Sequence, residues 1–285
     1  MSFDTYPMTL VNGSEQSVIS VTDRGLAYGD GLFETIMVVN GEMPLWPYHH
    51  ARLLKGLLAL NITLEAERLR NDIDQLLALT SRTSSDLHIL KVIVTRVAGG
   101  RGYQSTETEA NLIVSLYPLE LEIGKSDGVS VHICQQRLPC GVSWAGLKTL
   151  NQLPYVLAAS ERDNTAYSEG ILLSTQGDIV EATARNVFIV NNEKVYTPRL
   201  DQNGVAGVMR EVIIDKITPQ LGIECAEASM TMNDLLAAEE IFLTNSITGV
   251  WPVIQVEQKS IKVGPVTRSI QAMCPITNVP NKIGM

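Results

Sequence analysis

The chain has 285 residues, of which 45% are hydrophobic and 19% are charged, a composition that suits one large or two medium domains and excludes a disordered chain. Its formal net charge of −9 argues against a broad nucleic-acid surface, because such surfaces gather Lys and Arg. A few local cations would still bind a small anionic ligand.

In the first part of the chain, short strand patterns alternate with helical patterns. Strands are predicted at residues 8–13, 34–45, 88–97 and 111–119. The second of these contains an Asn40-Gly41 turn. Helices are predicted over residues 48–62 and 68–80, because leucines recur there with helical spacing. The glycine-rich segment "AGGRGY" lies between the last two strands.

The second part of the chain begins with a strand at 129–136 and continues with a helix over 154–162. Two strands at 169–175 and 187–198 are expected to be separated by a turn at Gly177-Asp178. A helix from residue 208 is expected to end at Pro219, and residues 240–256 read as strand, turn, strand.

This order predicts two domains of mixed α/β (α+β) type. We expect a smaller N-terminal α+β domain over residues 1–118, a linker over 119–128, and a larger domain of barrel-like sheet and helices over 129–285.

The cysteines and the N-terminal sequence indicate whether a metal site is expected and in which cellular compartment the protein lies. None of the four cysteines forms a CxxC pair, and no histidine stands at zinc-site spacing from a cysteine, so no metal site is predicted. The chain shows neither a signal-peptide pattern at its start nor an apolar run of ~18 residues. We therefore expect a cytoplasmic protein with free thiols and no membrane contact.

A candidate reactive amine lies in the charge-poor segment "AGLKTLNQL", which contains Lys148. Desolvation lowers the pKa of a lysine and makes its amine a nucleophile or a Schiff-base partner. Most lysines are ordinary surface residues, so this segment alone leaves both interpretations open.

A candidate carboxylate, Glu181, lies just before the strand-like "VFIV". Such an acid pairs well with a protonated heterocyclic nitrogen, whereas the alternative is a solvated acid in a turn. Asn186 reads equally well as a plain turn residue.

Several segments offer possible anion-binding groups. Gly204 and Gly207 precede a predicted helix start, where backbone N–H groups suit a phosphate, although an ordinary turn has the same pattern. The segment "TNSITG" offers hydroxyl groups, and Arg52 offers a guanidinium, unless it is simply an exposed helix residue. In "GGRGY", Arg101 suits a substrate carboxylate, and an exposed loop arginine is the alternative.

Six segments together resemble the fold-type IV pyridoxal-phosphate enzymes, a group that contains branched-chain aminotransferases, D-amino-acid aminotransferases and 4-amino-4-deoxychorismate lyase. The segments are "DRGLAYGDGLFET", "HARL", "GLKTLNQL", "GDIVEATARNVFIV", "YTPRLDQNGVAGVMRE" and "IFLTNSITGVWPV". They occur in the family order over about residues 10–255. Within the group, "KVIVTRVAGGRGY", "YTPRLDQNGVAGVMR" and the Thr35 of "LFET" read most like the lyase members.

The resemblance implies a role for each matching residue. Lys148 would form the Schiff base with pyridoxal 5'-phosphate and then move protons, and Glu181 would face the pyridine nitrogen. The phosphate would be held by the residues that match its family ligands, which are Arg52, Val208, Met209, Asn245 and Ser246. Arg101 and Tyr103 would bind a substrate carboxylate, and Thr35 would assist the departing group. Arg185 receives no role.

The implied activity is the conversion of 4-amino-4-deoxychorismate to 4-aminobenzoate and pyruvate in folate biosynthesis, by a pyridoxal-phosphate-dependent carbon–oxygen lyase. The alternative is an aminotransferase that acts on D-amino acids or branched-chain amino acids. The resemblance also implies a homodimer. A non-catalytic binding protein on the same scaffold is a third possibility.

Overall fold

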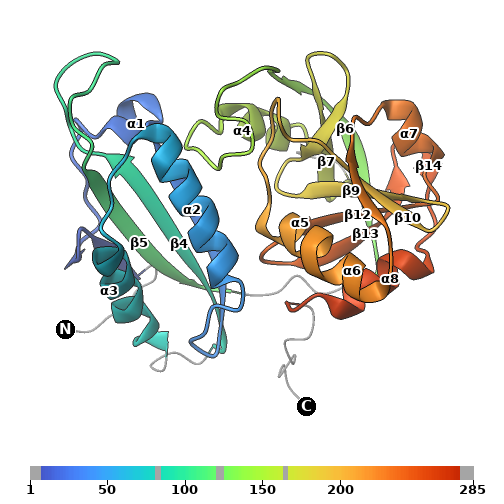
Figure 1. Cartoon of the computed structure of the whole chain (residues 1–285), viewed down its shortest axis with the longest axis horizontal. Helices are drawn as coiled ribbons and strands as arrows, with labels where there is room; N and C mark the ends of the chain where they lie inside the picture. Colours follow the sequence, from blue (N-terminus) through green and yellow to red (C-terminus); the bar gives the residue numbers. More distant parts are fainter. Residues whose placement is uncertain (1–7, 81–84, 120–124, 163–165, 277–285) are drawn as a thin grey trace. The chain divides into compact units, whose positions relative to one another are not determined.

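The structure is a computed structural model that describes residues 8–80, 85–119, 125–162 and 166–276. These residues form two compact units (Figure 1). The first unit ends at residue 119 and also includes Leu147–Asn151, whereas the second takes 125–146 and 152–276. The sequence analysis placed Lys148 in the C-terminal domain, whereas the structure places its segment, Leu147–Asn151, in the first unit. Residues 120–124 of the predicted linker lie outside the described residues.

The first unit is built on a five-stranded antiparallel sheet in the order β2-β1-β5-β4-β3. Its strands are β1 (Met8–Val11), β2 (Ser14–Glu15), β3 (Gly31–Val39), β4 (Leu87–Arg96) and β5 (Ala110–Pro118). The strands predicted at 8–13, 88–97 and 111–119 are confirmed, whereas that at 34–45 is confirmed only up to Val39. Asn40-Gly41 forms the predicted turn with positive φ angles of 50° and 80°. The edge position of β3 leaves one side of it open for further pairing.

Two helices cover one face of this sheet (Figure 1) and account for both helices predicted in this part of the chain. They are α2 (Trp46–Leu60) and α3 (Ala66–Leu77). Their apolar stripes, which include Leu53, Leu57, Leu69 and Ile73, join the buried face of the strands in one hydrophobic core. The opposite face of β3 lies outside this core and carries the half-buried side chains of Phe33 and Thr35.

A short helix, α1 (Arg24–Tyr28), occupies the glycine-rich segment before β3, where the sequence predicted no helix. Asp23 caps it by accepting a hydrogen bond from the backbone N–H of Leu26, and Gly29 ends it in the left-handed conformation with φ 66°. Asp23 also accepts hydrogen bonds from Thr95 and Asn111, which attaches the helix to the sheet.

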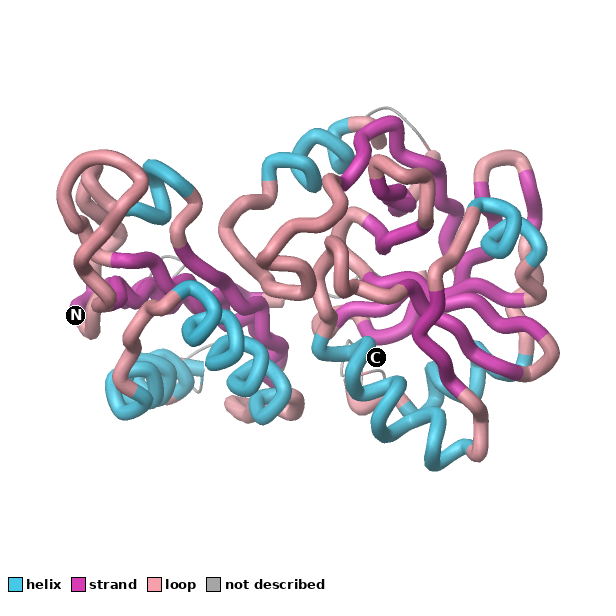
Figure 2. The backbone as a smooth tube through the Cα atoms, turned by 45° about the horizontal axis from the view of Figure 1, so that its top comes forward, coloured by secondary structure: helices cyan, strands magenta, loops and turns pink. Residues whose placement is uncertain are grey.

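The second unit contains a curled nine-stranded sheet in the order β11-β10-β9-β12-β13-β6-β7-β8, with β14 on β13 (Figure 2). The strands are β6 (Val129–Leu138), β7 (Glu169–Ser174), β8 (Ile179–Ala182), β9 (Asn186–Asn191), β10 (Lys194–Pro198), β11 (Cys225–Ala228), β12 (Glu240–Asn245), β13 (Gly249–Val256) and β14 (Lys259–Ser260). The predicted barrel-like sheet with surrounding helices is confirmed.

The predicted strand over 187–198 is in fact a hairpin of β9 and β10. Asn192 and Glu193 form its turn with φ angles of 50° and 60°, a conformation that Asn favours and Glu does not. The strand β8 was also missed, although it follows the predicted Gly177 turn and carries Glu181. These short strands are buried on both sides and therefore lack an alternating pattern.

The helices of the second unit are α4 (Leu153–Ser160), α5 (Val208–Val212), a π-helical turn (Ile213–Ile217), α6 (Thr218–Leu221), α7 (Met232–Ala237) and α8 (Pro265–Met273). The predicted end at Pro219 is wrong. The π-turn lets the helix continue, because it places Pro219 in the first turn of α6, where no N–H is required. The helix ends at Gly222, which has φ 68°. No helix within the described ranges is long and apolar enough to cross a membrane.

The carboxylate of Asp30 joins two arginines that hold several loops of the first unit. It accepts hydrogen bonds from Arg24 Nε at 2.9 Å and from Arg96 Nε at 2.9 Å. The same arginines donate to the backbone carbonyls of Gly102 and Tyr103 and of Asn61. Burial raises the pKa of Asp30, but the hydrogen bonds and charges of Arg96 and Arg24 outweigh burial and lower it.

Replacement Asp30→Asn is expected to reduce the free energy of unfolding at pH 7 by about 2–4 kcal/mol, because two partly buried guanidinium groups lose their counter-ion. A carboxyl with a lowered pKa contributes its full stabilisation above its unfolded pKa, so the difference from wild type should shrink as the pH falls below about 4 and vanish only below the lowered pKa of the folded state. Urea unfolding at several pH values measures it. The exposed Glu42→Gln is the control, and an equal loss in both variants would contradict the assignment.

Candidate active site

The segment that contains Lys148 is fixed by the edge of β3. The backbone N–H of Phe33 donates to the carbonyl of Lys148 at 3.1 Å, and the N–H of Leu150 donates to the carbonyl of Gly31 at 3.0 Å. Thr149 stands opposite Leu32 in this short antiparallel pairing. Leu147 is buried in the core of the first unit, so the lysine is anchored on both sides.

The side chain of Lys148 lies over an aromatic ring on the open face of the sheet. Its Nζ atom is 4.2 Å from the centroid of Phe33, within the range of a cation–π contact. The residue is only half-exposed. Lys148 is therefore not a fully exposed side chain, and its role as the Schiff-base amine stays a prediction.

The same face carries Thr35 and a second lysine that the sequence analysis did not single out. Lys91 on β4 stands directly opposite Thr35 on β3, and its Nζ atom is 5.6 Å from the Phe33 centroid. Residues paired across antiparallel strands share a face, so Thr35 and two ammonium groups surround one ring. This face is suited to a small anionic molecule. Only the strand register reveals Lys91, since the two residues are 56 positions apart in the sequence.

Arg52 lies on α2 and forms a buried cluster with Glu34 and His49. Arg52 Nε donates to Glu34 Oε1 at 2.8 Å, and His49 Nδ1 is 2.7 Å from Glu34 Oε2. Burial raises the pKa of Glu34, but Arg52 and His49 together lower it below its ordinary value. Burial lowers the pKa of His49 more than Glu34 raises it, so the imidazole is neutral at pH 7. Arg52 is thus no exposed helix residue, because its side chain is 10% exposed.

The backbone of the "GGRGY" loop is held in place by hydrogen bonds, whereas its side chains are exposed. Arg24 donates to the carbonyls of Gly102 and Tyr103 at 3.0 and 2.7 Å. Arg101 is exposed, and Tyr103 is 89% exposed and contacts Tyr28 edge-on with 5.5 Å between ring centroids. The exposure of Arg101 is what an ordinary loop arginine would show. Its role in binding a substrate carboxylate stays a prediction.

In the second unit, Glu181 lies on β8 and is 3% exposed, so the solvated-turn interpretation is wrong. Its carboxylate accepts hydrogen bonds from the Tyr155 hydroxyl at 2.5 Å, Asn186 Nδ2 at 3.0 Å and the Val205 N–H at 2.9 Å. Burial, and then the Glu181 charge, raise the pKa of Tyr155 far above its ordinary value, so the hydroxyl keeps its proton as donor. A buried acid with converging donors is an oriented anionic group.

Asn186 connects this carboxylate to the helix start predicted to hold a phosphate. Its Nδ2 also donates to the carbonyl of Val205 at 2.9 Å, and a Cβ atom at position 207 would lie 1.9 Å from its Oδ1. Only glycine fits at position 207. Gly207 is the N-cap of α5, so no side chain of its own caps the first turn of Val208 and Met209, and N–H groups at such a helix start suit an anion.

The turn after β12 contains the predicted residues Asn245 and Ser246. Asn245 Oδ1 accepts hydrogen bonds from the backbone N–H of Ile247 at 3.0 Å and of Thr248 at 2.8 Å, which fixes the turn. Thr244 donates to the carbonyl of Gly249 at 2.9 Å. Asn245 and Thr244 both bind the protein's own backbone, and Ser246, the next residue, is half-buried.

Arg185, which had no predicted role, has a structural one. Its Nη1 lies 2.5 Å from the buried carboxylate of Glu169, and its guanidinium carbon lies 3.4 Å from a ring centroid of Trp251. These contacts place it in the packing of β7 and β13.

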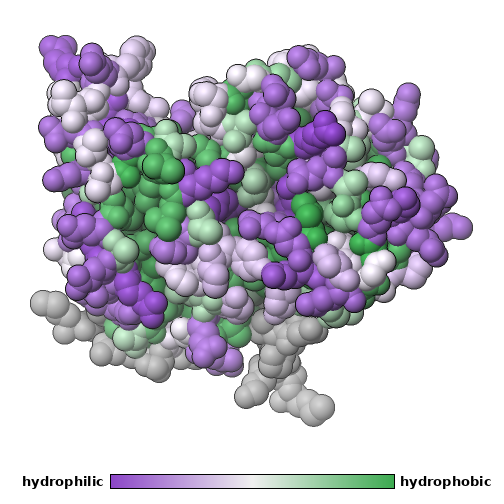
Figure 3. Space-filling model, viewed as in Figure 1, coloured by the Kyte–Doolittle hydropathy of each residue, from purple (hydrophilic) through white to green (hydrophobic). Residues whose placement is uncertain are grey.

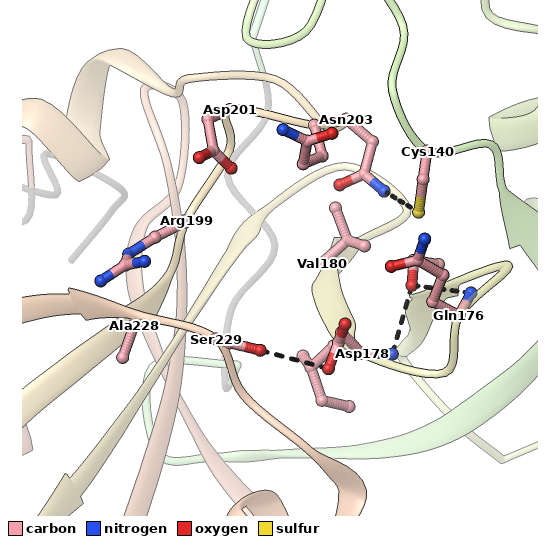
Figure 4. A pocket seen from close by; sticks show the side chains of 12 residues that line it. Cys140, Gln176, Asp178, Val180, Arg199, Asp201, Asn203, Ala228 and Ser229 are labelled. Atoms are coloured by element: carbon pink, nitrogen blue, oxygen red, sulfur yellow. Dashed lines mark hydrogen bonds between the residues drawn. The ribbon is translucent and has the colours of Figure 1, made fainter.

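A pocket of about 160 Å³ lies elsewhere in the second unit, between the turn after β7 and the segment after β10 (Figure 4). Asn203 donates toward Cys140 Sγ at 3.5 Å, and Ser229 donates to Asp178 at 3.2 Å. None of the predicted site residues lines this pocket, so we do not assign it to the active site.

Comparison with known proteins tests the resemblance. The model of the family described as amino-transferase class IV matches residues 31–256. The chain belongs to this family. The match contains Thr35, Lys148, Glu181 and every other residue to which the sequence analysis gave a role.

Individual family members cover almost the whole chain. Aminodeoxychorismate lyase of Vibrio harveyi is 32% identical over 93% of this chain and 98% of its own length. The crystal structure of 4-amino-4-deoxychorismate lyase from Pseudomonas aeruginosa is 35% identical, with a TM-score of 0.87 over 93% of this chain and 97% of that chain. A putative branched-chain-amino-acid aminotransferase of Methanocaldococcus jannaschii is 30% identical over 89% of this chain and 88% of its own length.

Replacement Tyr155→Phe is expected to reduce the free energy of unfolding by about 1–3 kcal/mol, because the buried Glu181 carboxylate loses a donor. Thermal and urea unfolding measure it. The matched control is Tyr196→Phe, since Tyr196 is half-buried and its hydroxyl forms no hydrogen bond with another described residue. If both variants lost the same stability, the hydrogen bond to Glu181 would not be the cause.

Proposed function

We propose that this protein is a pyridoxal-phosphate-dependent aminodeoxychorismate lyase, which converts 4-amino-4-deoxychorismate to 4-aminobenzoate and pyruvate in folate biosynthesis. The observation that carries the proposal is the face of β3, where Thr35 and two lysines surround Phe33. The lyase relatives from Vibrio harveyi and Pseudomonas aeruginosa support it by their names and their nearly complete coverage.

The residues present fit the chemistry of pyridoxal phosphate. Glu181 is a buried carboxylate whose donors orient it, which suits a protonated pyridine nitrogen. The uncapped first turn at Val208 and Met209 suits a phosphate, with Asn245, Ser246 and Arg52 as the further phosphate-binding residues that we propose. Lys148, held over Phe33, is the amine that would anchor the aldehyde.

When bound, the cofactor supplies an electron-withdrawing ring that stabilises negative charge on the carbon bearing the substrate amine. Lys148 would remove the proton from that carbon as a general base. The ether bond to the enolpyruvyl group then breaks, the six-membered ring becomes aromatic, and the enolpyruvyl fragment takes up a proton to leave as pyruvate. The substrate and the two products balance without an oxidant or a reductant.

Thr35 is the residue that we propose for orienting the departing enolpyruvyl oxygen and delivering its proton. Lys91 lies directly opposite and adds a positive charge where the carboxylates of this substrate require one. Arg101 and Tyr103 are the proposed further contacts to a substrate carboxylate. An aminotransferase needs the same lysine and glutamate, so those two residues do not distinguish the activities.

The enzyme is expected to form 4-aminobenzoate when supplied with chorismate, ammonia and an amidating partner enzyme. Lys148→Ala should lose at least ~100-fold in rate, because it lacks the proton-transferring amine. The exposed Lys55→Ala is the matched control and should keep full activity. If no 4-aminobenzoate formed and a keto acid arose from D-alanine or a branched-chain amino acid with 2-oxoglutarate, the aminotransferase alternative would replace the lyase.

Thr35→Ala is expected to lower kcat of the lyase reaction by ~10- to 100-fold, whereas Thr35→Ser should recover most of it, because the serine restores the hydroxyl. Steady-state assays of 4-aminobenzoate release, together with the visible spectrum of the bound cofactor, measure the effect. Equal kcat in the wild type and Thr35→Ala would remove Thr35 from the mechanism.

We also propose a homodimer in the cytoplasm. Hydrophobic side chains gather over α2 (Figure 3), where Leu54 is 46% and Leu58 is 84% exposed, and such a patch gains from burial by a second chain. The thiols of Cys134, Cys140, Cys225 and Cys274 are free, which suits a reducing compartment. Light scattering coupled to gel filtration determines the oligomeric state.

A further inference from the structure

Three side chains with metal-binding atoms, none of them assigned to the proposed active site, converge in the second unit. His132 and Cys134 lie two residues apart on β6 and therefore point to the same face of the strand. Glu161, at the C-terminal end of α4, completes the group. One ligand atom from each residue lies within 4.8 Å of the other two.

His132 supplies the observation that points to a ligand. Its side chain is buried, with 8% exposure, and Nε2 has no hydrogen-bond partner among the residues that the structure describes. Buried imidazole nitrogens are normally paired with a donor, an acceptor or a metal ion. The imidazole offers one of the three converging ligand atoms of the group.

The surroundings hold the other two ligand atoms in place. The Glu161 carboxylate accepts the backbone N–H groups of Gln135 at 2.6 Å and Gln136 at 2.8 Å, and each oxygen keeps a further lone pair. Beneath the group, a Cβ atom at Gly170 would lie 2.4 Å from Cys134 Sγ and 2.7 Å from His132 Nε2. Only a glycine leaves space for both ligand atoms.

We propose that His132, Cys134 and Glu161 form a binding site for one divalent transition-metal ion of the zinc class. A nitrogen, a thiolate and a carboxylate oxygen are ligands that Zn²⁺ accepts, whereas Mg²⁺ and Ca²⁺ prefer oxygen alone. Zinc bonds of about 2.0–2.3 Å require the ligand atoms to approach to about 3.3–3.8 Å, a closure of about 1 Å. A water molecule would complete the tetrahedron.

The charges of the site balance when the metal is bound. The ion binds cysteine as thiolate, so its arrival releases the Cys134 proton to solvent, and the thiolate and the Glu161 carboxylate offset its two positive charges. The neighbouring Arg137 and Arg162 donate to the backbone carbonyls of Cys134 and Ser168. The bound ion would tie the middle of β6 to the end of α4. The sequence analysis predicted no metal site from its cysteine and histidine spacing, and Glu161, 27 residues from Cys134, was not considered there.

Cobalt titration of the tag-free, metal-stripped holoenzyme tests the proposal, because Co²⁺ replaces Zn²⁺ and is coloured. We expect one Co²⁺ per chain, a thiolate-to-cobalt charge-transfer band in the difference spectrum, and loss of that band when Zn²⁺ is added. Thermal unfolding with Zn²⁺ should occur at a higher temperature than without it.

Variants identify the ligands. Cys134→Ser should lose the charge-transfer band, and His132→Asn and Glu161→Gln should each weaken Co²⁺ binding at least ~10-fold. The matched control, Cys225→Ser, should keep the band, and all four variants should keep 4-aminobenzoate formation if the protein is a lyase. An absent band with excess Co²⁺, or an unchanged band in Cys134→Ser, would overturn the proposal. If one variant failed to fold, the other two still decide the outcome.

Discussion

The backbone pairing between β3 and Leu147–Asn151 is the constraint on which the proposed chemistry depends. A lysine on a free loop would lose too much side-chain entropy to hold one position. Here two backbone hydrogen bonds fix the lysine's main chain, and the Phe33 ring fixes the direction of its amine. The same strand carries Thr35, so the proposed base and the proposed proton donor are positioned by one rigid element.

Glu181 shows the same principle in the second unit. An isolated buried carboxylate is costly, and the hydroxyl of Tyr155 and the amide of Asn186 offset that cost by hydrogen bonding. Asn186 also approaches Gly207 so closely that no side chain is tolerated there. The acid and the helix start are thereby coupled, and a change at Asn186 would disturb both a ring-nitrogen contact and a phosphate contact of the proposed cofactor.

Much of the fold could be predicted from local patterns. Alternation in β1, β4 and β5 and the leucine spacing in α2 identified these elements, because one face of each is buried and the other is not. The failures have physical causes. The strand β8 is buried on both faces and shows no alternation, and the π-turn before Pro219 depends on packing that the local sequence does not encode.

The candidate site residues Lys148 and Glu181 could be proposed from the sequence because a family pattern preserves local order around them, and their roles stay predictions. Their partners could not be found in this way, because the Lys91–Thr35 pair follows from strand register, and the contact between Tyr155 and Glu181 follows from how α4 packs on the sheet. The group of His132, Cys134 and Glu161 has the same origin. His132 and Cys134 lie on one strand, and their spacing matches no metal-binding motif. Glu161 comes close to them only because α4 packs against β6. A motif search therefore detects chemistry that is contiguous in sequence, whereas chemistry that is assembled by topology requires the fold.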